Sequence, residues 1–171
     1  MKKWIGALCS GLAGVLSLVF LAMPAFTMKA FGAKESFSGW DILTKKEWAE
    51  LDLTAVTWYR IFAWIMVVLA IVLIVVAILQ VLANLGVIKM PAIVSTVAKY
   101  ALIAIAVAAV LTLVANFGIR SEQIDGFKDT FGKAAAKEYW KNISVGIALW
   151  FVAIVNVAAA VCGKLFAKNE D

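Results

Sequence analysis

The chain alternates between long apolar stretches without a charged residue and connections and tails that carry all of its charges. The uncharged stretches cover residues 4–28, 61–88, 100–119 and 143–163. A helix rises about 1.5 Å per residue and the hydrocarbon of a bilayer is about 30 Å thick, so roughly 20 apolar residues cross it. Each stretch reaches that length. The pattern therefore predicts four membrane spans.

The spans are expected to be helices. Inside lipid every backbone N–H and C=O needs a partner within the protein, so a span is either a helix or a strand of a closed barrel. Barrel strands alternate polar and apolar positions over about ten residues, whereas residues 65–79 are apolar throughout. We expect an all-α fold. It would be an integral membrane four-helix bundle forming a single domain over 1–171, with outer loops at 29–60 and 120–141 that contain short amphipathic helices.

Small residues recur at helical spacing along the spans. Gly6, Ser10 and Gly14 follow one another at four-residue intervals in the first span, and Thr112 and Asn116 continue a stripe of alanines in the third. Small side chains at this spacing let helix backbones approach closely in lipid, where van der Waals contact drives association. We therefore expect each span to turn one face toward another helix, which gives a compact bundle.

The polar residues within the spans are uncharged. None of the four stretches contains Asp, Glu, Lys, Arg or His, although carriers and proton pumps usually keep such a group in the membrane. We expect Gln80 and Asn156 to form hydrogen bonds between helices, worth about 0.6 kcal/mol on average and up to about 1.7 kcal/mol. The alternative is a polar path through an oligomer, lined by Gln80, Thr112, Asn116 and Asn156.

The outer loops contain patterns that favour short helices. Thr44 and Glu47 match the S/T-x-x-E capping box, which predicts a helix that opens at Lys45 and runs toward or into the second span. Apolar residues recur every four positions over 127–139 and predict a second short helix.

Aromatic residues crowd the boundary between the spans and the two long loops. Most of them are expected to lie at headgroup depth, where Trp and Tyr anchor membrane helices. Trp40 and Trp48 are different, because they lie in the first outer loop away from the span ends. We expect these two to pack a small outer cap or to contact a partner.

The distribution of lysines predicts an orientation. The chain has a net charge of +5, and the short connection 89–99 contains basic residues without an acidic one, whereas the two long loops are nearly balanced. Basic residues in short loops mark the cytoplasmic side. With the first apolar stretch retained as a span, we expect a multi-pass protein of the cell membrane with both termini cytoplasmic.

Residues that usually carry chemistry are scarce. The chain has no histidine, and its two cysteines, Cys9 and Cys162, lie within or at the edge of apolar stretches. We expect them to pack as small hydrophobes, because a disulfide is unfavourable near the cytoplasmic face. No nucleotide-binding, hydrolase or metalloprotease motif is present. The sequence predicts no catalytic residue, no cofactor, no metal and no enzymatic activity, and the scattered basic residues predict no nucleic-acid binding.

Two features carry a resemblance to known four-span families. The layout of a short tail, a span, a longer loop, two spans with a tight connection, a second loop and a last span resembles that of claudins and peripheral myelin proteins. Claudins carry a Trp and two Cys in the first outer loop, whereas this loop contains Trp40 and Trp48 without Cys, and the Cys-Cys-Gly of tetraspanins is also missing. Residues 36–40, which read SFSGW after MPAF at 23–26, resemble small uncharacterised four-span proteins of Gram-positive bacteria.

The claudin layout implies adhesion or paracellular sealing, and the bacterial likeness names no activity. We expect a non-enzymatic scaffold, accessory or self-associating membrane protein that acts through helix faces and outer loops. The alternative is an oligomeric pore or a carrier for ions or small solutes. The expected partners are the lipid bilayer and either a second copy or another membrane protein.

Overall fold

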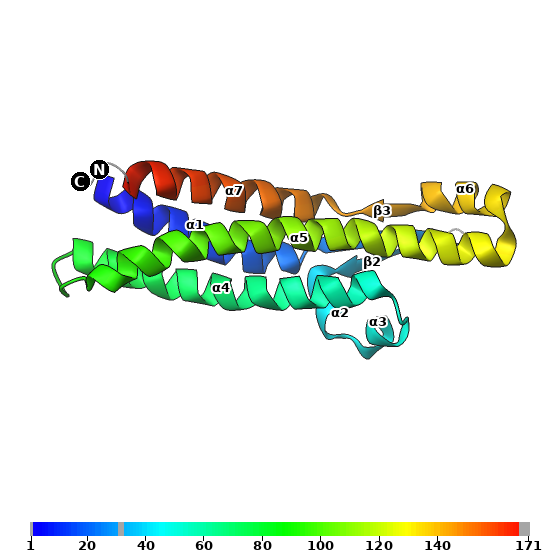
Figure 1. Cartoon of the computed structure of the whole chain (residues 1–171), viewed down its shortest axis with the longest axis horizontal. Coiled ribbons are helices and arrows are strands. Elements are labelled where there is room, and N and C mark those ends of the chain that lie inside the picture. The colour runs from blue at the N-terminus through cyan, green and yellow to red at the C-terminus, as the bar shows by residue number, and fades with distance from the viewer. Residues whose placement is uncertain (1, 31–32, 168–171) are drawn as a thin grey trace.

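Four long helices pack side by side in an elongated bundle (Figure 1). The computed structural model describes residues 2–30 and 33–167. Within them the long helices are α1 (Lys2–Leu21), α4 (Thr54–Asn84), α5 (Ala92–Phe131) and α7 (Ile147–Ala167). Each is long and apolar enough to cross a membrane. The predicted helical bundle with four candidate spans is thereby confirmed.

The helices form a closed ring. α4 packs against α1 and α5, and α7 packs against α5 and α1. Both termini and the α4–α5 connection lie at one end of the bundle, here called the terminal end (Figure 1). The other two connections lie at the opposite, distal end. The bundle therefore has one end with a single tight connection and one end that carries most of the non-helical chain.

The helix ends follow from backbone chemistry. α4 ends before Gly86, whose φ of 76° is strained for residues with a side chain. α5 begins after Pro91, which lacks an N–H and cannot continue a preceding helix. α5 ends just before Gly132, whose φ is 85°. A glycine with positive φ therefore lies just beyond the end of both α4 and α5.

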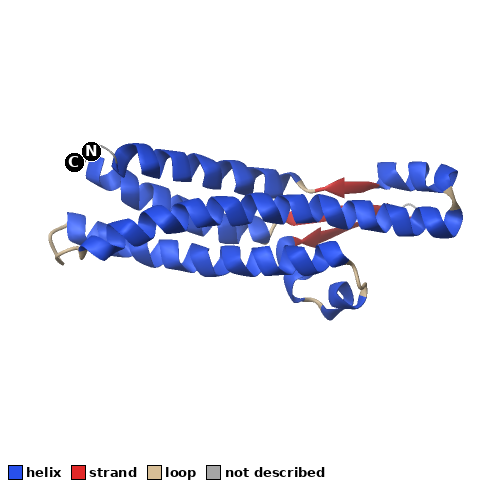
Figure 2. Cartoon of the chain, viewed as in Figure 1, coloured by secondary structure: helices blue, strands red, loops and turns tan. Residues whose placement is uncertain are grey.

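A small antiparallel sheet lies at the distal end, where Figure 2 shows the strands in red. Strands β1 (Pro24–Ala30), β2 (Ala33–Ser38) and β3 (Ile143–Val145) are arranged in the order β2-β1-β3. Phe26 of β1 is paired with Phe37 on one side and with Val145 on the other. The all-α expectation missed this sheet, because β1 and β3 continue the apolar stretches and periodicity does not mark their ends.

The expected span ranges differ from the helices for this reason. Within the stretch 4–28 the helix ends at Leu21, because Pro24 begins β1 and disfavours helical backbone before it. The stretch 143–163 begins with β3, and α7 starts only at Ile147. Gly146 joins them so closely that a Cβ there would lie 1.9 Å from the Pro24 carbonyl oxygen.

The two middle spans extend beyond their uncharged stretches at three of their four ends. α4 starts before residue 61 and ends before 88, and α5 runs past both limits of 100–119. The expected loop 120–141 is therefore mostly helix: α5 continues to Phe131, and α6 (Lys133–Asn142) folds back along it. Charge ends an apolar stretch but does not end a helix, because Lys, Glu and Gln are good helix formers.

Short helices α2 (Gly39–Thr44) and α3 (Lys46–Glu50) follow the sheet. The capping box predicted at Thr44 and Glu47 is wrong. Ser38 and Asp41 form one instead: the Ser38 hydroxyl accepts from the Asp41 N–H at 3.1 Å, and the Asp41 carboxylate accepts from the Ser38 N–H at 2.8 Å. The Thr44 hydroxyl donates to the Trp40 carbonyl.

The helix expected from Lys45 does not run into the second span. α3 is separate from α4, and Asp52 between them has a φ of 47°. A non-glycine residue with positive φ breaks the helical path. Short helices do occur in both connections, but their amphipathic character remains a prediction.

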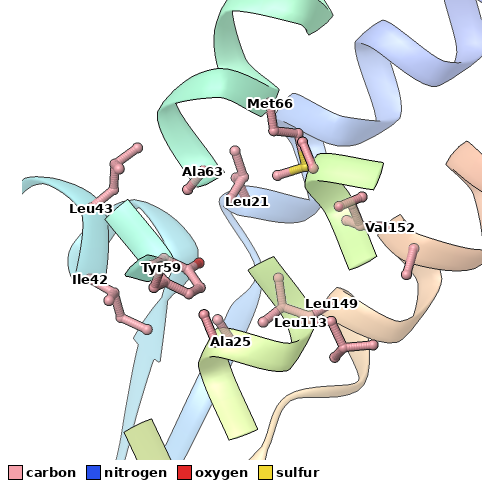
Figure 3. Packing of buried hydrophobic residues seen from close by; sticks show 14 of the residues in the cluster. Leu21, Ala25, Ile42, Leu43, Tyr59, Ala63, Met66, Leu113, Leu149 and Val152 are labelled. Carbon is pink, nitrogen blue, oxygen red and sulfur yellow. The ribbon is translucent and has the colours of Figure 1, made fainter. Parts of the chain in front are cut away.

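The hydrophobic core runs without a break from the bundle into the distal end. Figure 3 shows Met66, Leu113 and Val152 within the bundle, with Leu21 near Met66. Tyr59, fully buried, lies beside Ile42 of α2 in the same view. We call the sheet, α2, α3, α6 and the part of α5 beyond residue 119 the distal assembly, and it shares one core with the helices.

Candidate functional site

The glycine stripe of α1 faces α4. A Cβ at Gly14 would lie 2.7 Å from the Ala70 carbonyl oxygen, so the two backbones are in direct contact there. Gly6 lies against the Gln80 side chain, whose amide nitrogen would be 3.7 Å from a Cβ at Gly6. Small residues in α1 therefore bring this helix close to α4 along most of its length.

A buried hydrogen bond joins α1 to α7. The Asn156 side-chain amide donates to the Ser17 hydroxyl at 2.8 Å and to the Val152 carbonyl at 2.9 Å. The Ser17 hydroxyl donates to the Ala13 carbonyl at 2.7 Å. Ser17 is a polar residue of the first span but was not among the contact residues expected from the sequence. The sequence does not show that this serine contacts α7, because a serine in a helix can also donate its hydroxyl hydrogen bond to a backbone carbonyl of the same helix.

The remaining polar residues of the bundle are buried without a shared network. Thr112 donates to the Ala108 carbonyl of its own helix at 2.8 Å. Within the described part of the chain, the Ser10 hydroxyl, the Gln80 side-chain carbonyl and both polar atoms of the Asn116 side chain lack a hydrogen-bond partner. Asn116 is fully buried, so its unmade hydrogen bonds carry a penalty of about 1–3 kcal/mol.

An aromatic cluster caps the distal end. Trp48 is only 4% exposed and meets the rings of Phe26 and Phe37 edge-on, at centroid separations of 5.8 and 5.2 Å. Trp40 is partly buried against the same core. Of the two roles expected for these tryptophans, packing a small cap agrees with the burial of Trp48.

Two charged residues that the sequence did not single out connect the distal assembly to the helices. The Arg60 guanidinium of α4 donates to the carbonyls of Ile42, at 2.9 Å, and Lys45. The Glu122 carboxylate of α5 accepts from the Ala55 N–H, with oxygens at 3.1 and 3.2 Å. Arg60 therefore binds carbonyls at and just past the end of α2, and Glu122 caps the start of α4.

A third charged contact holds α6 against α5. The Arg120 guanidinium lies 4.0 Å from the centroid of the Trp140 ring and donates to the Trp140 carbonyl at 3.1 Å. Phe127 stacks on Tyr139 at 4.2 Å between the same two helices. Burial raises the pKa of the Tyr139 hydroxyl, so this ring stays neutral and packs as a hydrophobic surface.

The distal carboxylates are arranged for structure. Hydrogen bonding from the Ser38 N–H, helped by Lys45, lowers the pKa of Asp41 and keeps it charged as a helix cap.

Across the ranges 2–30 and 33–167, no three His, Cys, Asp or Glu side chains come together as metal ligands. An open groove over β3 and α7 is lined by apolar side chains, including Trp150 and Phe151.

No protein-family model, curated protein or solved structure matches this chain. The resemblances to claudin-like proteins and to bacterial four-span proteins remain predictions. Function is therefore inferred from the placement of side chains alone. That placement puts the polar residues of the spans inside the bundle and presents a compact, mixed-charge assembly at one end.

Proposed function

We propose that the protein is a non-enzymatic scaffold or accessory protein of the cell membrane, which contacts a second copy or another membrane protein through its distal assembly. Both termini would be cytoplasmic and the distal assembly extracytoplasmic. The observation that carries the proposal is the attachment of this assembly to the bundle through a shared core, Arg60 and Glu122. A rigidly held surface binds a partner with a smaller entropy penalty than a mobile loop.

The charges and aromatics support this orientation. Lys89, Lys99 and Lys164 are exposed at the terminal end, where the described residues include no acidic side chain. Near the distal end of the bundle, Trp58 and Trp64 are about half exposed on α4. Basic residues on the cytoplasmic side and tryptophans at the interface are typical of membrane helices.

The tip of the α5–α6 hairpin is the part of the assembly best placed for contact. Phe131 is 64% exposed there. Lys128 and Asp129 are exposed beside it on α5, and Lys133 follows on α6. Interfaces combine an aromatic centre with a polar rim, and an exposed phenylalanine among charges fits that pattern.

An oligomeric pore is the second candidate, and Asn116 is the observation that favours it. Its unpartnered amide would suit a polar path or an internal water. Against this, Gln80, Thr112, Asn116 and Asn156 are all buried within a single chain. A path between copies would need them to face outward, so their burial supports the scaffold over the pore.

Photo-crosslinking tests the proposal. A photoreactive phenylalanine analogue is placed at Phe131 in the full chain, with Ile78 as the matched control because it is 54% exposed within the uncharged stretch of α4. In native membranes we expect a protein crosslink from position 131 and lipid adducts from position 78. Liposomes containing the purified protein should pass no ions.

The opposite pattern would support the pore. No protein crosslink from position 131, together with an ion flux in liposomes that Asn116→Leu abolishes, would overturn the scaffold. Crosslinks identified by mass spectrometry distinguish a second copy from a different membrane protein. Tags at either terminus that are accessible from outside intact cells would overturn the proposed orientation.

A further inference from the structure

The chain's two cysteines, which lie near opposite ends of the sequence, meet across the seam between α1 and α7. The side chains of Cys9 and Cys162 lie close enough to interact with each other, and each is partly buried. The expectation that they act as separate small hydrophobes did not anticipate this pairing. Spacing along the sequence says nothing about contact between the first and last helices of a ring.

The register of the two helices accounts for the meeting. α1 and α7 run antiparallel, and Phe20 stacks on Phe151 with ring centroids 6.1 Å apart. Cys9 precedes Phe20 by eleven residues, and Cys162 follows Phe151 by eleven. Eleven residues make about three helical turns. Both cysteines therefore return to the face that carries the stacked rings, about three turns nearer the terminal end.

The neighbours of the pair are closely packed in the bundle. Ser10, next to Cys9, is fully buried. Gly163, next to Cys162, packs so closely on Leu102 that a Cβ would lie 2.7 Å from its methyl group. The buried bond between Ser17 and Asn156 fixes the same register farther along. The two thiols are thus held together by contacts that do not depend on them.

We propose that Cys9 and Cys162 form a redox-sensitive pair that closes a reversible disulfide between the first and last helices. The oxidant is a small disulfide that enters the bilayer. One cysteine thiolate attacks it, which forms a mixed disulfide and releases one small thiol. The second cysteine then attacks the protein sulfur of the mixed disulfide and releases the second small thiol. Two protein thiols are oxidised and one small disulfide is reduced to two thiols.

The bond would lock the ring of helices at its terminal end. In a reducing compartment the pair remains as two thiols, and an oxidising shift closes it. The closed form ties α1 covalently to α7, so every span then lies within one covalent loop. Closing such a long loop restricts the unfolded chain and raises stability.

The test uses 4,4′-dithiodipyridine, a membrane-permeant aromatic disulfide, on the full-length protein in detergent or liposomes. The wild type should release two equivalents of pyridinethione, retain no pyridylthio group by intact mass and resist alkylation until reduced. Cys162→Ser is the matched control, and it should release one equivalent and retain one pyridylthio group at Cys9. The oxidised wild type should also melt at a higher temperature than the reduced wild type.

Three results on the wild type would each overturn the proposal. The first is retention of two pyridylthio groups, because each thiol would then have reacted alone. The second is a covalent dimer on a non-reducing gel in place of an oxidised monomer. The third is no release from the folded protein under conditions in which the SDS-denatured protein reacts fully. All three are read on the unmutated chain, so a variant that fails to fold does not affect the outcome.

Discussion

At the scale of single residues, the buried polar side chains and the glycines explain which helices pack against each other. Hydrophobicity does not distinguish one apolar helix face from another in lipid, so close backbone contact and side-chain hydrogen bonds decide the pairing. Gly14 and Ser17 on α1 lie on successive turns and serve the two purposes separately, since Gly14 contacts α4 and Ser17 contacts α7. Sequence spacing identified the stripe that contains Gly14 but not the helix that it meets.

Asn156 and Ser17 are expected to be energetically coupled. Their hydrogen bond is 2.8 Å long and fully buried between two spans, so a double-mutant cycle with Asn156→Ala and Ser17→Ala should give a coupling of about 0.6 kcal/mol, and at most about 1.7 kcal/mol. The measurement is the free energy of unfolding from SDS titration in mixed micelles. Thr112→Ala is the control, because Thr112 bonds within its own helix, and its effect should simply add to that of Asn156→Ala. Additivity in both cycles would contradict the role assigned to Asn156.

Gly14 and Gly11 are expected to respond differently to the same added methyl group. Gly14→Ala places a Cβ 2.7 Å from the Ala70 carbonyl and must separate α1 from α4, which should destabilise the protein by about 1–3 kcal/mol. Gly11→Ala places its Cβ 3.5 Å from that of Ala77, an ordinary contact, and should change stability little. The same SDS titration measures both. Equal effects of the two substitutions would show that the backbones are not in close contact at Gly14.

At the scale of elements, the long helices were predictable and the distal assembly was not. Uncharged length alone identifies a span, because the bilayer imposes it. The end of α1 was missed because residues 24–28 are as apolar as the helix before them, while their strand pairing depends on β2 and on β3 from the far end of the chain. The cap of α2 was missed for a simpler reason. Ser38 and Asp41 form a capping box with Asp in place of the Glu that the motif specifies.

The capping box of α2 gives a prediction about substitution. Ser38→Ala removes the side-chain oxygen that accepts from the Asp41 N–H, and should destabilise α2 by about 1 kcal/mol. Hydrogen exchange over residues 38–45 measures the effect. Thr44→Ala is the control, because Thr44 lies at the end of α2 and bonds to the Trp40 carbonyl. If Thr44→Ala had the larger effect, the cap would be assigned to the wrong residue.

The same motif gives a prediction about pH. The folded pKa of Asp41 is lowered by the Ser38 N–H and by Lys45, so its contribution to stability is complete above its unfolded pKa of about 3.9. That contribution is lost as the pH falls through the lower, folded pKa. Exchange over residues 38–45 should therefore accelerate at acidic pH beyond its intrinsic pH dependence, and Asp41→Asn should remove this extra acid sensitivity. An unchanged acid response in Asp41→Asn would contradict the role of the carboxylate.

At the scale of the whole molecule, the distal assembly and the bundle are joined by close contacts. A Cβ at Gly39 would lie within 2.9 Å of both Leu21 and the Tyr59 hydroxyl, and one at Gly146 would overlap the Pro24 carbonyl. Added to the charged contacts of α4 and α5, these joints leave the assembly little freedom to hinge. The scaffold proposal depends on that rigidity, since a surface fixed relative to the membrane presents itself to a partner in one orientation.

Glu122 tests this coupling directly, because it caps α4 from a different helix. Its carboxylate accepts from the Ala55 N–H, which otherwise has no partner within α4. Glu122→Ala should destabilise the protein by about 1–2 kcal/mol and speed hydrogen exchange in the first turn of α4. Glu122→Gln keeps an accepting oxygen but loses the charge that favours a helix N-terminus, so a loss of about 0.3–1 kcal/mol is expected.

Glu138→Ala is the matched control, since the Glu138 carboxylate forms an exposed ion pair with Lys141. This substitution should leave hydrogen exchange in α4 unchanged. If Glu122→Ala left the first turn of α4 as protected as in the wild type, the distal end of α5 would not be holding α4, and the rigid attachment on which the scaffold proposal rests would fail with it.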